Sequence, residues 1–193
     1  MWSLPYGPVS NFRIHQNKFL RSYTADLSVG RVLNLGAMPD APDKEGAIYE
    51  MYFPNSEFIT LDLGENSSPK HITADLMVEQ KGLDPFDLVL AMSVIEHIDR
   101  PWLAAPNITR MLKPGGHLYV AMPFFYPVHE GPYYGDHWRA TPSAIRHLFD
   151  QLEEVTHDLY PSSIVAIRDR KTYWQNPKNH YAGFSMLLRR PLV

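Results

Sequence analysis

The sequence predicts an α/β fold built on an open, mostly parallel sheet. The first observation is the nearly continuous apolar run Phe86–Met92, typical of a parallel strand covered on both faces. The second is a helical pattern that follows it and leads into another strand, His117–Pro123. The third is a set of strand-like segments earlier in the chain, which gives the order β-α-β-β-α-β.

The connection between the two central strands carries helix start and stop signals. Ser93 has the N-cap residue type, and Glu96 follows at the capping-box spacing. Pro101 indicates a second helix start within the same segment. Lys113–Gly116 ends the helical pattern before His117. We therefore expect a right-handed strand–helix–strand unit.

The other predicted elements follow the same patterns. A helix over 11–25 belongs to an N-terminal helical cover, residues 1–30. The remaining predictions are strands over 31–36, 57–63, 71–76, 152–160 and 181–188, a weak helix over 44–52, and a helix over 142–149 capped by Thr141.

Length and composition indicate a single domain over residues 1–193. The chain has 193 residues, of which 45% are hydrophobic, enough for one buried core. A net charge of −3 gives no support for nucleic-acid binding. We find no membrane span or signal peptide and expect a cytoplasmic protein. Without cysteine, any metal site must use His, Asp or Glu.

Ligands of open α/β sheets bind beyond the carboxyl ends of the strands, where the strand order reverses. Asp62 ends the second predicted strand. A carboxylate there can accept hydrogen bonds from the two hydroxyls of a ribose. An equally supported alternative is that Asp62 only caps the end of its own strand.

The chain resembles the class I S-adenosylmethionine-dependent methyltransferases, in particular small ones linked to sugar or polysaccharide modification. The resemblance covers residues 31–149 and rests on segments in a fixed order: Phe86–Val89, Ser93–Ile98, Leu112–Gly116 and Asp136–Pro142. It implies a Rossmann-like, mostly parallel seven-stranded sheet with an antiparallel last strand and helices on both faces. It also implies S-adenosyl-L-methionine as cofactor.

By this resemblance Asp62 meets the ribose and Asp75 the adenine amino group. The implied cofactor-binding residues are Gly36, Asp62, Leu63, Asp75, Leu76 and Met92. The turn after the first strand departs from the family pattern, because Asn34 replaces the usual acid. Met38 and Asp40 stand where the family usually has glycines.

His97 is the predicted catalytic residue. It lies beside the expected cofactor, and a base with a near-neutral pKa suits removal of a proton from a hydroxyl acceptor. The alternative is that Glu96 and His97 only orient the start of the helix.

The loop over residues 123–140, here called the lid loop, is rich in aromatic and polar side chains. We predict that it covers the acceptor, because rings stack on sugars and His or Arg hold hydroxyl or phosphate groups. The alternative is a satellite core with Arg139 paired to an acid. The predicted substrate-binding residues are Tyr126, His129, Tyr133, His137, Trp138 and Arg139.

The sequence contains two further candidate sites, one for a metal ion and one for an anionic acceptor. Some related methyltransferases use carboxylate and histidine ligands near Glu96 and His97, and His129 or His137 can join them. Ser93 stands where a metal-using relative has an acid, and we predict no metal. The basic segment 168–180 either holds an anionic acceptor or is a solvated loop, and it receives no role.

The predicted function is S-adenosylmethionine-dependent methylation of an oxygen on a small polar acceptor such as a sugar derivative. The alternative is a methyltransferase-like domain with lost or altered cofactor binding that acts as a binding or assembly partner. The altered turn over residues 34–40 motivates this alternative.

Overall fold

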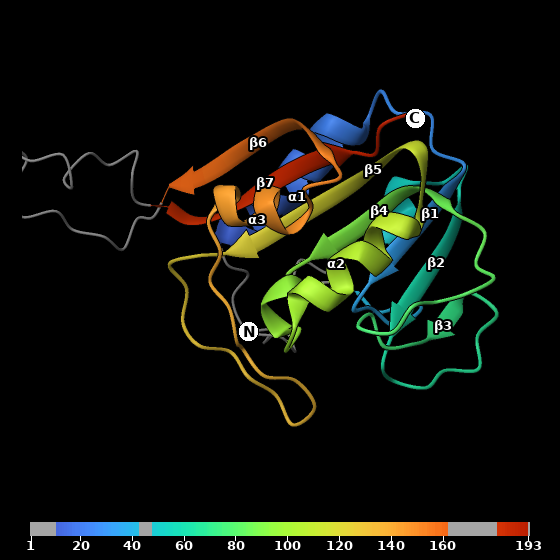
Figure 1. Cartoon of the computed structure of the whole chain (residues 1–193), viewed down its shortest axis with the longest axis horizontal. Helices are drawn as coiled ribbons and strands as arrows, with labels where there is room; N and C mark the ends of the chain where they lie inside the picture. The colour runs from blue at the N-terminus through green and yellow to red at the C-terminus, as the bar shows by residue number, and fades with distance from the viewer. Residues whose placement is uncertain (1–10, 43–47, 162–180, 193) are drawn as a thin grey trace, which may run out of the picture.

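The sheet forms the centre of the computed structural model, which describes residues 11–42, 48–161 and 181–192. Its seven strands have the order β3-β2-β1-β4-β5-β7-β6 (Figure 1). The elements are α1 (Asn11–Thr24), β1 (Arg31–Leu35), η1 (Tyr49–Tyr52), β2 (Glu57–Asp62), β3 (His71–Thr73), β4 (Phe86–Met92), η2 (Ile95–His97), α2 (Pro101–Arg110), β5 (Leu112–Pro123), α3 (Pro142–Leu148), β6 (Glu153–Pro161) and β7 (Tyr181–Arg189).

Strand directions agree with the predicted class of fold. The pairs β1 with β2, β1 with β4, β2 with β3, and β4 with β5 are parallel. Strand β7 runs antiparallel to both β5 and β6. The prediction of a mostly parallel seven-stranded sheet with an antiparallel last strand is therefore confirmed.

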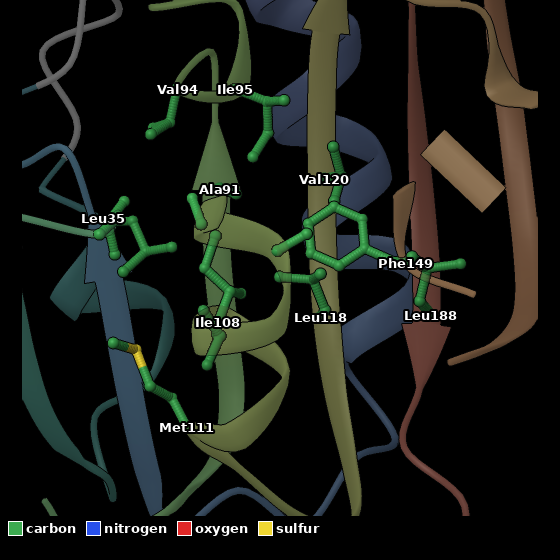
Figure 2. Close-up of a cluster of buried hydrophobic side chains, with 14 of the residues drawn as sticks. Leu35, Ala91, Val94, Ile95, Ile108, Met111, Leu118, Val120, Phe149 and Leu188 are labelled. Atoms are coloured by element: carbon green, nitrogen blue, oxygen red, sulfur yellow. The ribbon is translucent and has the colours of Figure 1, made fainter. Parts of the chain in front are cut away.

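Helices cover both faces of the sheet and create two cores. The α2-side core contains Val89 and Ala91 of β4 together with Ile108 of α2. Figure 2 shows side chains of the strands and of α2 converging in this core. The α1-side core contains Leu88 and Leu90 of β4, with residues of α1 packed on them. Successive side chains of a strand point to opposite faces, so β4 needs apolar residues at nearly every position.

The helix after β4 starts later than the capping-box pattern predicts. Ser93 has a left-handed backbone (φ 58°), and its N–H donates to Ala121 O at 2.9 Å. It therefore extends the sheet pairing and does not cap a helix. A 3₁₀ turn, η2, follows, and α2 begins at Pro101. The second predicted start was correct, because proline is well suited to the first helical position.

Other boundaries also differ from the predictions. Of the helix predicted over 44–52, residues 44–47 lie outside the described part, and the rest forms the 3₁₀ turn η1. The strand predicted over 71–76 ends at Thr73. Strand β5 begins at Leu112 and not at His117, because the predicted stop signal pairs with the C-terminal segment. Gly115 N–H donates to Arg190 O at 2.9 Å, and Arg190 N–H donates to Gly116 O at 2.8 Å.

Asp87 ties the starts of three strands together at the edge opposite the candidate site. Its Oδ2 accepts the N–H groups of Gly30 at 3.0 Å and Arg31 at 2.8 Å. Its Oδ1 accepts from Lys113 Nζ at 2.8 Å. Partial burial raises the pKa of Asp87, but the hydrogen bonds and the charge of Lys113 outweigh it, so that the pKa lies below its usual value.

We predict that Asp87→Asn lowers the free energy of unfolding by about 1 kcal/mol at neutral pH, because the group is partly exposed to solvent. A lowered folded-state pKa stabilises the protein above the unfolded pKa, and this contribution is lost as the pH falls. The difference between the two proteins should therefore shrink below about pH 4. Urea unfolding at several pH values measures it. The exposed neighbour Asp84→Asn is the control, and an equal effect of both substitutions would contradict this role.

Candidate functional site

The candidate site lies at the carboxyl edge of the sheet. Strand order reverses between β1 and β4, because the chain passes from β1 to β2 on one side while β4 lies on the other. This is the topological switch point at which open α/β sheets bind ligands. The loops at this edge follow β1, β2, β4 and β5. The last of them is the yellow to orange loop between β5 and α3 in Figure 1.

Gly36 makes the sharp turn after β1. Its φ is +62°, in the left-handed region that favours glycine. Its N–H donates to Leu61 O of β2 at 2.7 Å. A Cβ at this position would lie 2.9 Å from Val94 Cγ2. Backbone conformation and the nearness of the loop after β4 both require glycine here.

The end of β2 presents a carboxylate at the same edge. Asp62 is half-buried, and its Oδ1 accepts the N–H of Gly64 at 2.8 Å. This local bond is the capping role left open by the sequence. An ionised carboxylate has about four acceptor positions, so the bond leaves others for a ligand. The neighbouring predicted residue, Leu63, has a side chain that is 67% exposed.

The other predicted cofactor-binding residues are held by local structure. Asp75 Oδ1 accepts the N–H of Met77 at 2.8 Å. Asn107 of α2 donates to Leu76 O at 2.9 Å, and the Leu76 side chain is buried in the α2-side core. Met92 is buried in the α1-side core at the end of β4.

The turn after β1 differs physically from a glycine-rich one. Met38 lies against the loop after β2, so closely that a Cβ on Gly64 would be 2.1 Å from Met38 Cε. Asp40 has a left-handed backbone, with φ at 57°. Asn34 is buried where the family pattern has an acid. Met38, Asp40 and Asn34 also line a small hollow together with Thr60 and Lys70.

Glu96 is the most unusual group on the other side of the site. Its backbone carbonyl accepts the N–H groups of His137 at 2.8 Å and Trp138 at 3.3 Å, which brings the lid loop back over η2. Its side chain is fully buried, and neither carboxylate oxygen has a hydrogen-bond partner among the described residues. Burial raises the pKa of Glu96 to about 8, although the positive charge of Arg139 opposes this.

His97 and His129 face this carboxylate. His97 Nε2 and His129 Nε2 each lie 3.9 Å from Glu96 Oε1. The two imidazole rings meet edge to face, with their centroids 4.9 Å apart. Burial lowers the pKa of His97, and the nearby His129 adds to this effect. A neutral imidazole offers one nitrogen lone pair, which serves either a proton or a metal ion.

Asp136 holds the lid loop together. It accepts two hydrogen bonds from Arg139, the one from Nη2 at 2.6 Å. Its Oδ2 also accepts the backbone N–H of His129 at 3.0 Å. These donors keep the pKa of Asp136 far below its usual value, Arg139 contributing most. The side chain of Asp136 is therefore ionised and fixed.

The remaining lid residues divide into two groups. The Tyr126 ring packs between Phe12 of α1 and His129, with centroid distances of 6.1 and 5.3 Å. Trp138 donates to Ile98 O at 2.9 Å and lies edge to face with Trp102. In contrast, Tyr133 is 92% exposed and His137 is also exposed.

The structure thus brings His97, His129 and Tyr126 together and leaves Tyr133 and His137 outside this group. The Glu96 carboxylate and Tyr134, whose ring lies 4.8 Å from that of His97, were missed as members of the site. The capping-box pattern led to the interpretation of Glu96 as part of a helix start. The sequence signal for a site residue was an acid directly between the apolar Ile95 and His97.

Comparison with known proteins supports the fold. Residues 61–120 match the family model described as "Methyltransferase domain". No curated protein matches the chain. Within the part of the chain that the structure describes, we find no helix that is both long and apolar enough to cross a membrane.

Solved structures share the same architecture at low identity. The N-methyltransferase NodS of Bradyrhizobium japonicum WM9, in complex with S-adenosyl-L-homocysteine, is 17% identical with a TM-score of 0.60, over 94% of this chain and 89% of that one. An S-adenosylmethionine-dependent methyltransferase of Clostridium acetobutylicum ATCC 824 is 11% identical with a TM-score of 0.62, over 94% and 93%. The [4+2]-cyclase SpnF is 15% identical with a TM-score of 0.62, over 100% and 86%. These likenesses establish a shared fold.

We predict that Arg139→Gln loosens the lid loop without unfolding the sheet. The substitution removes charge-assisted bonds to Asp136 that are worth about 1.5 to 3 kcal/mol, so amide exchange over residues 124–138 should accelerate by about tenfold or more. Exchange in β4 and β5 should not change. Hydrogen-exchange mass spectrometry measures both regions.

The control for this prediction is Arg146→Gln, which breaks an ion pair with Glu154 outside the lid loop. Lid exchange that is equally slow in Arg139→Gln and in the unmodified chain would show that Asp136 and Arg139 do not hold the loop.

Proposed function

We propose that this chain is an S-adenosylmethionine-dependent methyltransferase that methylates an oxygen of a small polar acceptor such as a sugar derivative. The observation that supports the proposal is that the family match and the candidate site residues occupy the same part of the chain. The segment matched by the methyltransferase family model, residues 61–120, contains Asp62, Asp75 and the loop with Glu96 and His97. Asp62 ends β2, and the others follow β3 and β4 along the edge where this fold binds ligands.

The residues at this edge fit the ribose and adenine parts of the cofactor. Asp62 retains acceptor positions beyond its bond to Gly64, and Gly36 lets the backbone turn closely at the end of β1. Asp75 has a carboxylate oxygen fixed by the N–H of Met77. The fit is poorer for the methionine part, because Met38 takes the place of a glycine and packs on Gly64.

When bound, the cofactor supplies an electrophilic methyl group on a sulfonium centre. The chain has to hold donor and acceptor in line and keep water from the donor. In this proposal Asp62 accepts the ribose hydroxyls. The lid loop closes over the acceptor, and the exposed part of Trp138 offers an aromatic surface for stacking on a sugar.

A methyl-transfer assay tests the activity directly. Labelled S-adenosylmethionine is incubated with the protein and with a panel of sugars, phosphorylated sugars and small amines. The position of the methyl group in any product is then determined by NMR. Methylated oxygen on a polyhydroxylated product supports the proposal. Products methylated only on nitrogen would support methyltransferase activity but would contradict the proposed oxygen acceptor.

The second candidate is a methyltransferase-like binding domain without turnover. The position of Met38 favours it, because the side chain fills space at the turn that the family pattern leaves to glycine. The two candidates differ in one measurable quantity, the affinity for S-adenosylmethionine. Calorimetry that shows binding in the micromolar range favours the enzyme, and no binding at millimolar cofactor favours the binding domain.

We predict that Asp62→Ala weakens binding of S-adenosylhomocysteine by about 1.5 to 3 kcal/mol, the scale of hydrogen bonds to a charged group. This corresponds to a dissociation constant about 10- to 150-fold higher. Isothermal calorimetry measures it, and thermal unfolding confirms that the variant is folded. Glu65→Ala, an exposed acid in the same loop, is the matched control. Unchanged affinity in folded Asp62→Ala would remove Asp62 from the site.

We also predict that Met38→Ala binds S-adenosylhomocysteine more tightly than the unmodified chain, because it frees space beside Gly64. Met38→Leu keeps most of the volume and should bind like the unmodified chain. Both are measured by the same calorimetry. If Met38→Ala binds more weakly, Met38 forms part of the binding surface and does not obstruct it.

A further inference from the structure

The buried carboxylate of Glu96 has no hydrogen-bond partner among the described residues. Both oxygens lack a hydrogen bond, while the side chain is completely shielded from solvent. A buried, unpaired carboxylate is costly unless it is protonated, paired or bound to a metal ion. A protonated Glu96 would need an acceptor within about 3 Å. The nearest histidine nitrogens, at 3.9 Å, are too far away.

The neighbours of the two histidines decide which ring nitrogen carries the proton. His97 Nδ1 lies 2.5 Å from Gly135 O, and a carbonyl can only accept. His129 Nδ1 lies 3.1 Å from the ionised Asp136 Oδ2 and 3.2 Å from Pro127 O, which are also acceptors. We therefore infer that each Nδ1 donates to these acceptors. This leaves Nε2 of each ring, which lies 3.9 Å from Glu96 Oε1, as the nitrogen that can bind a metal ion.

Three potential metal-ligand atoms thus converge. Glu96, His97 and His129 each offer one ligand atom, and these three atoms all lie within 4.8 Å of one another. Zinc-type sites are tetrahedral with metal–ligand bonds of about 2.0 to 2.2 Å, so their ligand atoms are about 3.4 Å apart. The three ligand atoms here lie within 4.8 Å of one another, so they have to approach by at most about 1.4 Å, and His129 lies on a loop.

We propose that Glu96, His97 and His129 form a binding site for one divalent transition-metal ion of the zinc type. Two imidazole nitrogens and one carboxylate oxygen form a donor set that such ions prefer, whereas Mg²⁺ and Ca²⁺ favour oxygen ligands. Three protein ligands leave at least one coordination position open to water or to an oxygen of a second ligand. The proposal replaces the sequence-based expectation that the site has no metal.

Asp136 completes the arrangement as an outer partner. A carboxylate that accepts the second N–H of a metal-binding histidine fixes the ring and makes it a stronger ligand. Asp136 Oδ2 lies 3.1 Å from His129 Nδ1 and accepts the backbone N–H of His129, and Asp136 is itself paired with Arg139. The Asp136–Arg139 pair is neutral as a unit, so Glu96 contributes the net negative charge of the cluster. The positive charge of Arg13 also acts on Glu96.

This site changes the role assigned to His97. An Nε2 lone pair that binds a metal ion does not at the same time accept a proton from the acceptor. The histidine is then a ligand, and the role of a general base passes to another group. The metal site does not depend on the proposed methyl transfer, because it is inferred from the side chains alone.

Metal titration of untagged, chelator-treated protein tests the proposal without cofactor or acceptor. Zn²⁺ binding is followed by calorimetry, and Co²⁺ binding by visible absorption, which reports the coordination geometry. We expect one ion per chain and much weaker binding of Mg²⁺. Glu96→Gln and His129→Gln should each weaken Zn²⁺ binding by at least tenfold, and Asp136→Asn by about 10- to 100-fold as an outer-partner substitution.

The matched control is His137→Gln, which changes an exposed histidine of the same loop outside the cluster and should bind Zn²⁺ like the unmodified chain. If Glu96→Gln does not fold, His129→Gln still decides the question because its side chain lies on a surface loop. The proposal is overturned if the unmodified chain binds no stoichiometric Zn²⁺, if Mg²⁺ binds equally well, or if His129→Gln binds Zn²⁺ unchanged. The metal titration contains no S-adenosylmethionine, so a negative result there does not bear on the proposed methyl transfer.

Discussion

Burial of β4 on both faces is the constraint on which the rest of the structure depends. Leu88, Val89, Leu90 and Ala91 have no exposed surface, and their side chains alternate between the two cores. A strand of this kind requires a cover on each side, which α1 and α2 supply. Its neighbours β1 and β5 run parallel to it, so they are reached by crossover connections. The carboxyl ends of these strands then meet at one edge, and the candidate site can form only there.

The left-handed turn at Ser93 places the residues of the candidate site at this edge. Because Ser93 still pairs with β5 through Ala121, the chain cannot start a helix at once. The short η2 turn therefore lies beneath the lid loop, and it carries Glu96 and His97 in adjacent positions. The backbone carbonyl of Glu96 receives the N–H groups of His137 and Trp138. A helix that began at Ser93 would have committed this carbonyl to its own hydrogen bonds.

Much of the fold could be predicted because apolar periodicity reports burial directly. The strands at 31–36, 57–63 and 86–92 were found within about one residue, since each is a short buried run ended by a turn residue. The errors share a cause. Ser93, Glu96 and Lys113–Gly116 carry local signals for a cap or a stop, and pairing with β5 and with the C-terminal segment overrides them. Local propensity is weak compared with such tertiary contacts.

The candidate site was predicted less completely, because its chemistry depends on distances that one-dimensional spacing does not contain. Sequence patterns identified His97, His129 and Arg139 as candidates. His129 faces Glu96, 33 residues away, and His97 contacts Gly135, 38 residues away, whereas Arg139 pairs with Asp136, three residues before it. Which of His129 and His137 faces Glu96 depends on how Asp136 and Arg139 fold the lid loop. Asp136 accepts the backbone N–H of His129, whereas His137 packs over Gly135.

Glu96 and the lid loop therefore constrain each other. The carboxylate is shielded because the lid loop returns over η2, and the loop returns there because the Glu96 carbonyl accepts two of its N–H groups. Shielding in turn makes an unpaired negative charge unfavourable, so the same contacts that close the loop raise the pKa of Glu96 and favour either a proton or a metal ion at its carboxylate. In the proposed site His97 and His129 bind the ion through Nε2, because their Nδ1 atoms lie beside carbonyl and carboxylate acceptors. An apolar residue at position 96 would relieve the charge, but it would also remove the only anionic ligand of the cluster.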